Sequence, residues 1–175
     1  AYLHAENSNV ANIWLSSLEN PDNTEQVTSS TMGIYDFAVD SQAESIAYSM
    51  RDEINRNRDI FLLDIRSGNE ERLTFCGDAN SECYNPAFHP EDAVIAYVRV
   101  ERESFIGRVV SNVPRIWILD LESNTNQPLS TNTEFVGHSP VWSADGNSIA
   151  YYSADLSQPG VMVYNFNPQI NDTQS

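Results

Sequence analysis

The sequence contains no lysine, only two cysteines and only seven glycines among its 175 residues. Nine arginines are its only strongly basic side chains, against 25 acidic ones, and the formal net charge is −16. Because nucleic-acid binding requires a basic surface that neutralises phosphates, this balance argues against a nucleic-acid partner. No apolar run approaches the length of a membrane span and no signal-peptide pattern opens the chain, so the sequence predicts no transmembrane segment.

The composition is that of a folded protein. Hydrophobic residues make up 41% of the chain and aromatic residues 10%, which exceeds what disordered segments contain. A mass of 19.6 kDa is enough for one ordinary domain with a sizeable core, or for two small ones.

The two cysteines, Cys76 and Cys83, lie close together in a polar, loop-like segment. A zinc site needs about four ligands, usually from close Cys or His pairs, and the sequence has no second pair. Two alternatives remain open: a disulfide within the loop, or two free thiols. We favour the disulfide, because exposed unpaired thiols are reactive. A disulfide would place the protein in an oxidising compartment, either periplasmic or secreted.

A short motif recurs along the chain at an interval of about 50 residues. The triplet Ile-Ala-Tyr occurs at 46–48, 95–97 and 149–151, and Ala1-Tyr2 fits as a truncated first copy. A second apolar run follows each copy: Ile13–Leu15, Ile60–Leu62, Ile116–Ile118 and Val161–Val163. The chain therefore divides into repeat units at approximately 1–28 (partial), 34–75, 84–130 and 138–167.

Each repeat unit is predicted to form four short strands, which we name A to D in chain order. Strand A carries an aromatic residue, strand B is the Ile-Ala-Tyr run, strand C is the second apolar run, and strand D is a short exit such as Arg72–Thr74. Runs rich in β-branched and aromatic residues, bounded by Asn, Asp, Ser, Gly and Pro, are typical of strands. No stretch shows the period of an amphipathic helix. The sequence thus predicts three A strands, four B, four C and three D.

One copy of the repeat resembles a known family. Residues 140–151 read Pro-Val-Trp-Ser-Ala-Asp-Gly-Asn-Ser-Ile-Ala-Tyr, which resembles the Pro-x-Trp-Ser-Pro-Asp-Gly-x-x-Ile-Ala-Tyr repeat of TolB-like β-propellers. The same repeat type occurs in the propeller domains of prolyl-oligopeptidase-like proteins. Residues 86–97 form a looser copy, and 37–48 the weakest. The resemblance implies an all-β fold of four-stranded antiparallel blades, about three and a half in number.

Closed propellers have four to eight blades, so the sequence predicts a partial propeller. Three explanations remain open. The chain is a fragment of a longer propeller, or it contains a divergent blade that lacks the recognisable motif, or it forms an open arc that another chain completes. We favour the fragment.

The sequence marks no catalytic constellation. Ser143 lies in a turn and not in the Gly-x-Ser-x-Gly elbow of a hydrolase, and no residues remain to build a hydrolase domain. Asp40, Asp92 and Asp145 recur at the A–B turns, where they are predicted to cap the turn rather than to bind calcium. We therefore expect no enzyme activity, no cofactor and no metal.

The connections between strands B and C depart most from a plain repeat. In a four-stranded meander the B–C and D–A connections lie on one side of the blade, here named the B–C/D–A face, and seven of the nine arginines lie on or beside it. Arginine and aromatic residues dominate binding hot spots. The candidate interaction face comprises Arg51, Arg56, Arg58, Arg99, Arg102, Phe105, Ile106, Arg108 and Arg115. The alternative is an extended hairpin in solvent, with Arg99, Arg102 and Arg108 paired to Glu101 and Glu103.

The function predicted from these features is a non-catalytic binding module with a protein or peptide partner. An alternative from a different class is a structural subunit, or a propeller domain of a larger protein such as a prolyl-oligopeptidase-like hydrolase. In that case missing blades or a partner chain would complete the propeller.

Overall fold

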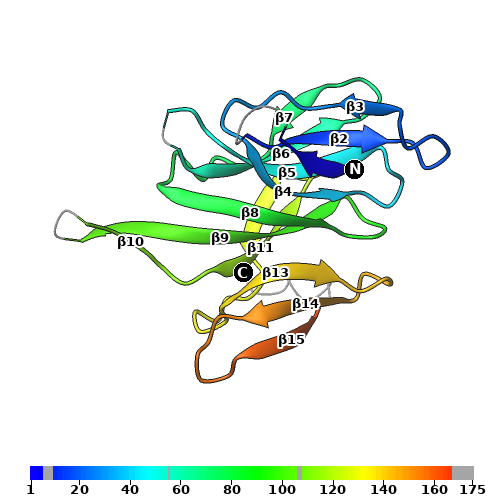
Figure 1. Cartoon of the computed structure of the whole chain (residues 1–175). Helices are drawn as coiled ribbons and strands as arrows, with labels where there is room; N and C mark the ends of the chain where they lie inside the picture. Colours follow the sequence, from blue (N-terminus) through cyan, green and yellow to red (C-terminus); the bar gives the residue numbers. More distant parts are fainter. Residues whose placement is uncertain (6–9, 55, 106–107, 167–175) are drawn as a thin grey trace.

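The computed structural model describes residues 1–5, 10–54, 56–105 and 108–166, with the backbone alone for 103–105 and 108–111. These residues form fifteen β-strands and contain no helix (Figure 1). The strands make four antiparallel sheets, which follow one another in chain order from blue to red in Figure 1. Within the described ranges, no helix is long and apolar enough to cross a membrane.

The four sheets are the blades. The first contains β1 (Tyr2–His4), β2 (Asn12–Ser16) and β3 (Thr24–Gln26), and the second contains β4 (Ile34–Val39), β5 (Ser45–Arg51), β6 (Arg58–Asp64) and β7 (Glu70–Arg72). The third contains β8 (Ser81–Phe88), β9 (Val94–Phe105), β10 (Arg108–Ser111), β11 (Arg115–Asp120) and β12 (Thr125–Pro128). The fourth contains β13 (Gly137–Trp142), β14 (Ser148–Ser153) and β15 (Gly160–Asn165).

The blades have the predicted strand content. Strand A is represented by β4, β8 and β13, strand B by β1, β5, β9 and β14, strand C by β2, β6, β11 and β15, and strand D by β3, β7 and β12. The all-β fold of about three and a half antiparallel blades is therefore confirmed. One boundary differs, because β8 begins at Ser81, before the predicted start of the third unit at residue 84.

The long connection between strands B and C of the third blade is a continuation of the sheet. Strand β9 pairs with β11 from Val94 to Arg99, and then with β10 from Arg102 to Phe105. Figure 1 shows β9 and β10 continuing beyond the ends of the neighbouring strands. The connection is thus an extended hairpin that stands out from the B–C/D–A face.

The Ile-Ala-Tyr motif alternates between the two faces of each blade. Ile46 and Tyr48 share a buried cluster with Ile13 of the first blade, whereas Ala47 belongs to the cluster that contains Tyr97 of the third. Successive strand residues point to opposite faces, so large side chains of one blade fill the space left by the small alanine of the blade before it. The next interface repeats this arrangement with Ala96, Ile149 and Tyr151.

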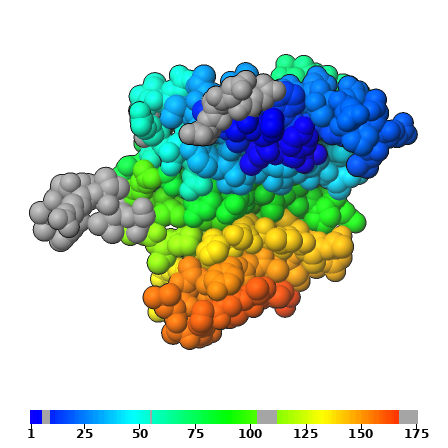
Figure 2. Space-filling model, in the orientation of Figure 1, coloured from blue at the N-terminus to red at the C-terminus, as the bar shows by residue number. Residues whose placement is uncertain are grey.

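The outer face of the fourth blade carries residues that are buried elsewhere in the repeat. Ile13, Ile60 and Ile116 occupy the first apolar position of strand C and are at most 1% exposed, because the following blade covers them. Val161 occupies the same position in β15 and is 72% exposed, and Val163 is 67% exposed. The first and fourth blades lie at opposite ends of the stack (Figure 2). Among the described residues, no blade therefore covers this face.

The A–B turns opposite the extended hairpin are closed by local and inter-blade hydrogen bonds. His89 Nδ1 accepts a bond from the Asp92 amide at 2.8 Å, and Nε2 lies 3.1 Å from the Gly146 carbonyl oxygen of the next blade. Gly146 has a φ of +69°, and a Cβ there would lie 2.1 Å from His89 Nε2. This histidine, which is 8% exposed, therefore joins two blades.

The predicted turn role of the A–B aspartates is confirmed at two positions. Asp40 Oδ1 accepts a hydrogen bond from the Glu44 amide at 2.8 Å, and Asp145 Oδ1 accepts one from the Asn147 amide at 3.1 Å. Hydrogen bonds from Ser143 and Asn147 lower the pKa of Asp145 to about 2. Both carboxylates therefore close their own turns.

Candidate interaction face beside the disulfide

The predicted arginines lie where strands B end and strands C begin. Arg51 closes β5 and faces Arg58, the first residue of β6, directly across the strand pair. Arg99 and Arg115 form a second such pair between β9 and β11. Like charges directly opposite each other destabilise a sheet, so each pair needs acceptors or aromatic faces nearby.

The remaining members of the predicted face are less fully described. Arg56 lies in the exposed B–C turn of the second blade with a φ of +60°. Phe105 and Arg108 belong to β9 and β10, where only the backbone is described, and Ile106 lies outside the described residues.

Glu82 joins two of the arginines. Its carboxylate, 12% exposed, accepts a hydrogen bond from Arg58 Nη2 at 3.0 Å and another from Arg102 Nη2. Arg102 Nη1 also donates to Asn57 Oδ1 at 2.5 Å, and Arg58 Nη1 lies 4.0 Å from Asp36. The network thereby connects the second and third blades at the B–C/D–A face.

Glu82 was missed by sequence reasoning, whose alternative of a hairpin in solvent paired Arg102 with Glu101 or Glu103. Among the described side chains, the carboxylate that contacts Arg102 is Glu82 of β8. The available signal was Glu82 itself, immediately before Cys83, since a strand A starting at residue 81 would have included it.

Tyrosine rings cover the guanidinium groups of Arg58 and Arg51. The central carbon of Arg58 lies 4.0 Å from the centre of the Tyr84 ring, and that of Arg51 lies 5.0 Å from the Tyr35 ring. Such contacts are favourable because the ring face is negative.

Burial raises the pKa of the Asp36 carboxyl, more than the hydrogen bond from the Asn85 amide lowers it.

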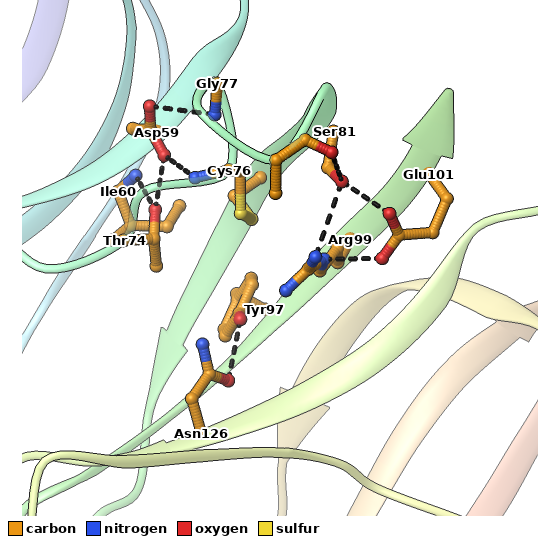
Figure 3. Close-up of a disulfide and its surroundings, with 12 residues drawn as sticks. Asp59, Ile60, Thr74, Cys76, Gly77, Ser81, Tyr97, Arg99, Glu101 and Asn126 are labelled. Carbon is orange, nitrogen blue, oxygen red and sulfur yellow. Dashed lines mark hydrogen bonds and ion pairs between the residues drawn. A yellow bond between two sulfur atoms is a disulfide. The ribbon is translucent and has the colours of Figure 1, made fainter. Parts of the chain in front are cut away.

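Cys76 and Cys83 form a disulfide, as predicted, that ties the D–A connection after β7 to strand β8. Their Cα atoms are 5.9 Å apart. The setting differs from the polar loop that the sequence suggested, because Cys76 is 2% exposed and Cys83 is fully buried, in one cluster with Tyr97. Figure 3 shows the bridge beside Tyr97 and Arg99. The disulfide is therefore part of the core between the second and third blades.

Next to the bridge, the fully buried carboxylate of Asp59 accepts several hydrogen bonds from the D–A connection (Figure 3). Oδ1 accepts hydrogen bonds from Thr74 Oγ1 at 2.9 Å and from the Cys76 amide at 2.6 Å. Oδ2 accepts one from Arg72 Nη2 at 2.8 Å. This carboxylate holds the start of the disulfide loop against strand C.

The first blade uses an amide in the same place. Asn12 precedes the isoleucine of its strand C, as Asp59 does, and its Oδ1 accepts hydrogen bonds from Thr28 Oγ1 at 3.1 Å and from the Ser30 amide at 2.7 Å. Sequence reasoning missed both residues. The signal was a polar residue before strand C together with a threonine after strand D.

The Arg99–Arg115 pair lines a cavity of about 440 Å³. Arg99 Nε lies 2.7 Å from Glu101 Oε1, and the Arg99 guanidinium stacks 4.6 Å above the Trp117 ring. Arg115 Nη2 donates 2.9 Å hydrogen bonds to the carbonyl oxygens of Ser130 and Asn132. The cavity lining consists of Arg99, Glu101, Asn112, Val113, Arg115 and Trp117.

No cluster of three or more His, Cys, Asp or Glu side chains suited to a metal ion occurs in the described ranges.

No protein-family model and no curated protein sequence matches this chain. Solved structures do. TolB from Acinetobacter baumannii is 20% identical with a TM-score of 0.65, over 90% of this chain and 36% of that one. A putative TolB from Agrobacterium tumefaciens is 18% identical with a TM-score of 0.68, over 92% and 52%. Dipeptidyl peptidase 4 from Porphyromonas gingivalis is 10% identical with a TM-score of 0.63, over 96% and 29%.

The chain therefore spans between about a third and a half of the TolB structures it matches. Both the likeness and the strand order describe the same architecture of antiparallel blades packed face to face. The protein has a TolB-like β-propeller fold.

Proposed function

We propose that this chain is a non-catalytic binding module that presents the B–C/D–A face to a protein or peptide partner. The observation that carries the proposal is the extended hairpin of β9 and β10, which stands on that face beside the arginine and tyrosine cluster. Loops and hairpins on rigid scaffolds are preferred binding elements. The A–B turns at the other end are closed on themselves and offer no comparable projection among the described residues.

Two arginines of this face are held in place before any partner arrives. Arg58 and Arg102 share Glu82, and Arg58 lies on the Tyr84 ring. A preorganised arginine loses less conformational entropy on binding than a free one. Tyr35 remains 45% exposed beside Arg51 and adds an aromatic anchor of the kind enriched at hot spots.

The disulfide supports a location outside the cytoplasm. Structural disulfides persist in oxidising compartments and are rare in the cytosol. The Cys76–Cys83 bridge is buried in the core, where it has a structural role. We therefore propose a periplasmic or secreted protein.

Substitution of Arg99, Arg102 and Arg108 by alanine tests this face. We expect the triple variant to retain a captured partner at least about tenfold less than the unmodified chain, because hot-spot arginines contribute most of the binding energy. Pull-down from an extracytoplasmic extract measures the loss. Arg66→Ala is the matched control, since Arg66 is 89% exposed and lies outside this face, with Glu44 3.4 Å away as its ion-pair partner. Undiminished capture by a folded triple variant would remove the face from the proposal.

The uncovered face of the fourth blade favours a second candidate function. Val161 occupies a position that the next blade buries elsewhere, and Val163 one that is buried or partly buried in the other blades. This exposure supports a propeller unit completed by further blades or by a partner chain. An apolar face of this kind promotes association.

Sedimentation velocity of the isolated chain tests that second function. We expect association that increases with protein concentration and with salt, since salt screens the repulsion between chains of charge −16. The double variant Val161→Thr with Val163→Thr should reduce it, whereas Val113→Thr, at a 52% exposed valine on another surface, should not. A stable monomer under all these conditions would contradict obligate completion.

A further inference from the structure

We propose that the cavity lined by Arg99, Arg115 and Trp117 binds a carboxylate group of the peptide partner. The inference deepens the proposed function and rests on it, because it assigns a ligand chemistry to one part of the B–C/D–A face. The cavity lies on β9 and β11 at the base of the extended hairpin, and Figure 3 places Arg99 next to the disulfide loop.

The described cavity lining contains two arginines but only one acidic residue, so it carries an excess positive charge. Arg99 and Arg115 stand directly opposite each other across β9 and β11, and opposed like charges destabilise a strand pair. Glu101 is the only acidic residue in the described cavity lining. It lies 2.7 Å from Arg99 Nε and accepts a 2.5 Å hydrogen bond from Ser81 Oγ. Glu101 thus pairs with Arg99, and a ligand carboxylate would balance the charge of Arg115.

Arg115 is the better placed of the two to receive it. Its Nη2 donates to the Ser130 and Asn132 carbonyl oxygens at 2.9 Å each, which orients the guanidinium without neutralising its charge. Its Nε is buried and has no acceptor among the described residues. Arginine recognises carboxylates through several parallel donors, so a fixed guanidinium at a cavity wall is suited to this ligand.

The rest of the lining indicates what lies beside the carboxylate. The Trp117 ring, with the Arg99 guanidinium 4.6 Å from its centre, and the half-exposed Val113 present apolar surface in the same cavity. A volume of about 440 Å³ falls in the range of small-ligand sites. The ligand that fits is a peptide group in which a carboxylate neighbours an aromatic or aliphatic side chain.

Titration with three small probes tests the proposal. N-acetyl-phenylalanine carries a terminal carboxylate, N-acetyl-glutamyl-phenylalaninamide carries a side-chain carboxylate, and N-acetyl-phenylalaninamide carries neither. We expect at least one acidic probe to shift the arginine Nε–H and tryptophan indole signals in ¹⁵N–¹H spectra at concentrations where the neutral amide does not. The stronger acidic probe then identifies the source of the carboxylate. Equal shifts with the neutral amide, or no shift with either acidic probe, would overturn the proposal.

Two substitutions with opposite expected effects on affinity distinguish a binding role from a structural one. Arg115→Gln should lower the affinity for the acidic probe by roughly ten- to a hundredfold, as expected for a lost charge-assisted hydrogen bond. Glu101→Gln should strengthen it, because the competing internal carboxylate is gone. Arg66→Gln is the matched control for charge and should change nothing. Weaker binding in Glu101→Gln, or no effect of Arg115→Gln in a folded protein, would contradict the site.

The same variants distinguish this proposal from the proposed function. Suppose that Arg115→Gln leaves partner capture intact while the triple variant at 99, 102 and 108 loses it. The proposed interaction face is then supported and the carboxylate site is contradicted. If neither variant affects capture, the proposed face falls as well.

Discussion

Asp59→Ala is expected to lower the free energy of unfolding by about 3–5 kcal/mol, the range for breaking a buried ion pair by removing one partner. The fully buried carboxylate accepts bonds from Thr74 Oγ1, the Cys76 amide and Arg72 Nη2. Its removal leaves these donors without their acceptor inside the core between two blades. Urea denaturation, followed by tryptophan fluorescence, measures the loss.

Two further variants make the Asp59 experiment specific. Asp78→Ala removes the other carboxylate near Arg72, which lies 3.7 Å away and is 64% exposed, and should cost less than about 1 kcal/mol. The loss of unfolding free energy in Asp59→Asn should lie between those of the two alanine variants. An amide oxygen can still accept hydrogen bonds from Thr74 and the Cys76 amide, just as Asn12 accepts two such bonds in the first blade. A cost below about 1 kcal/mol for Asp59→Ala would show that the carboxylate does not hold the loop.

Reduction of the Cys76–Cys83 bridge is expected to lower the free energy of unfolding by about 2–3 kcal/mol, the chain-entropy value for a loop of about seven residues. The bridge closes the D–A connection onto β8, and both cysteines lie in the core. Denaturation with and without reductant measures the effect. Mass spectrometry of the native and reduced chain should show a gain of about 2 Da, the two hydrogens added when a disulfide opens.

The Cys76→Ser, Cys83→Ser double variant is the control for reductant. It should be destabilised already and should not respond to reduction further. Thiols that react in the native, unreduced protein would contradict the bridge and remove the support for a location outside the cytoplasm. Because Cys83 faces Arg99 across β8 and β9, loss of the bridge should also weaken binding at the B–C/D–A face.

The fold could be predicted because its signal is local and repeated. The Ile-Ala-Tyr run predicts a strand and also how its blade packs against the blades on either side. The large residues point to one neighbouring blade and the alanine points to the other. Asp-Gly at 145–146 marks a turn, and Gly146 proves to be required by the approach of His89. Such features depend on residues close in sequence.

The candidate site could be predicted only as a set of arginines. Their location at the ends of strands B and starts of strands C follows from the repeat, but their partners do not. Glu82 reaches Arg58 of another blade, and Asp59 reaches the loop that follows strand D. These contacts depend on the path of the D–A connection and on how two sheets pack, so a local pattern marks the polar residues but does not identify all of their partners.

The burial of the disulfide shows the same limit. The residues between Cys76 and Cys83 are polar and indicate a surface loop, while the two sulfur atoms turn inward against Tyr97. The predicted pairing was correct, and the predicted surroundings were wrong, because spacing constrains the bridge but not the direction in which the loop folds back.

Hydrogen–deuterium exchange of the chain with and without its captured partner tests the central claim most directly. If the B–C/D–A face is the working surface, added protection should appear in β9 to β11 and in the connections at 51–58 and 73–81, with the A–B turns unchanged. Protection confined to the A–B turns, or to the outer face of β14 and β15, would contradict the claim and identify a different working surface.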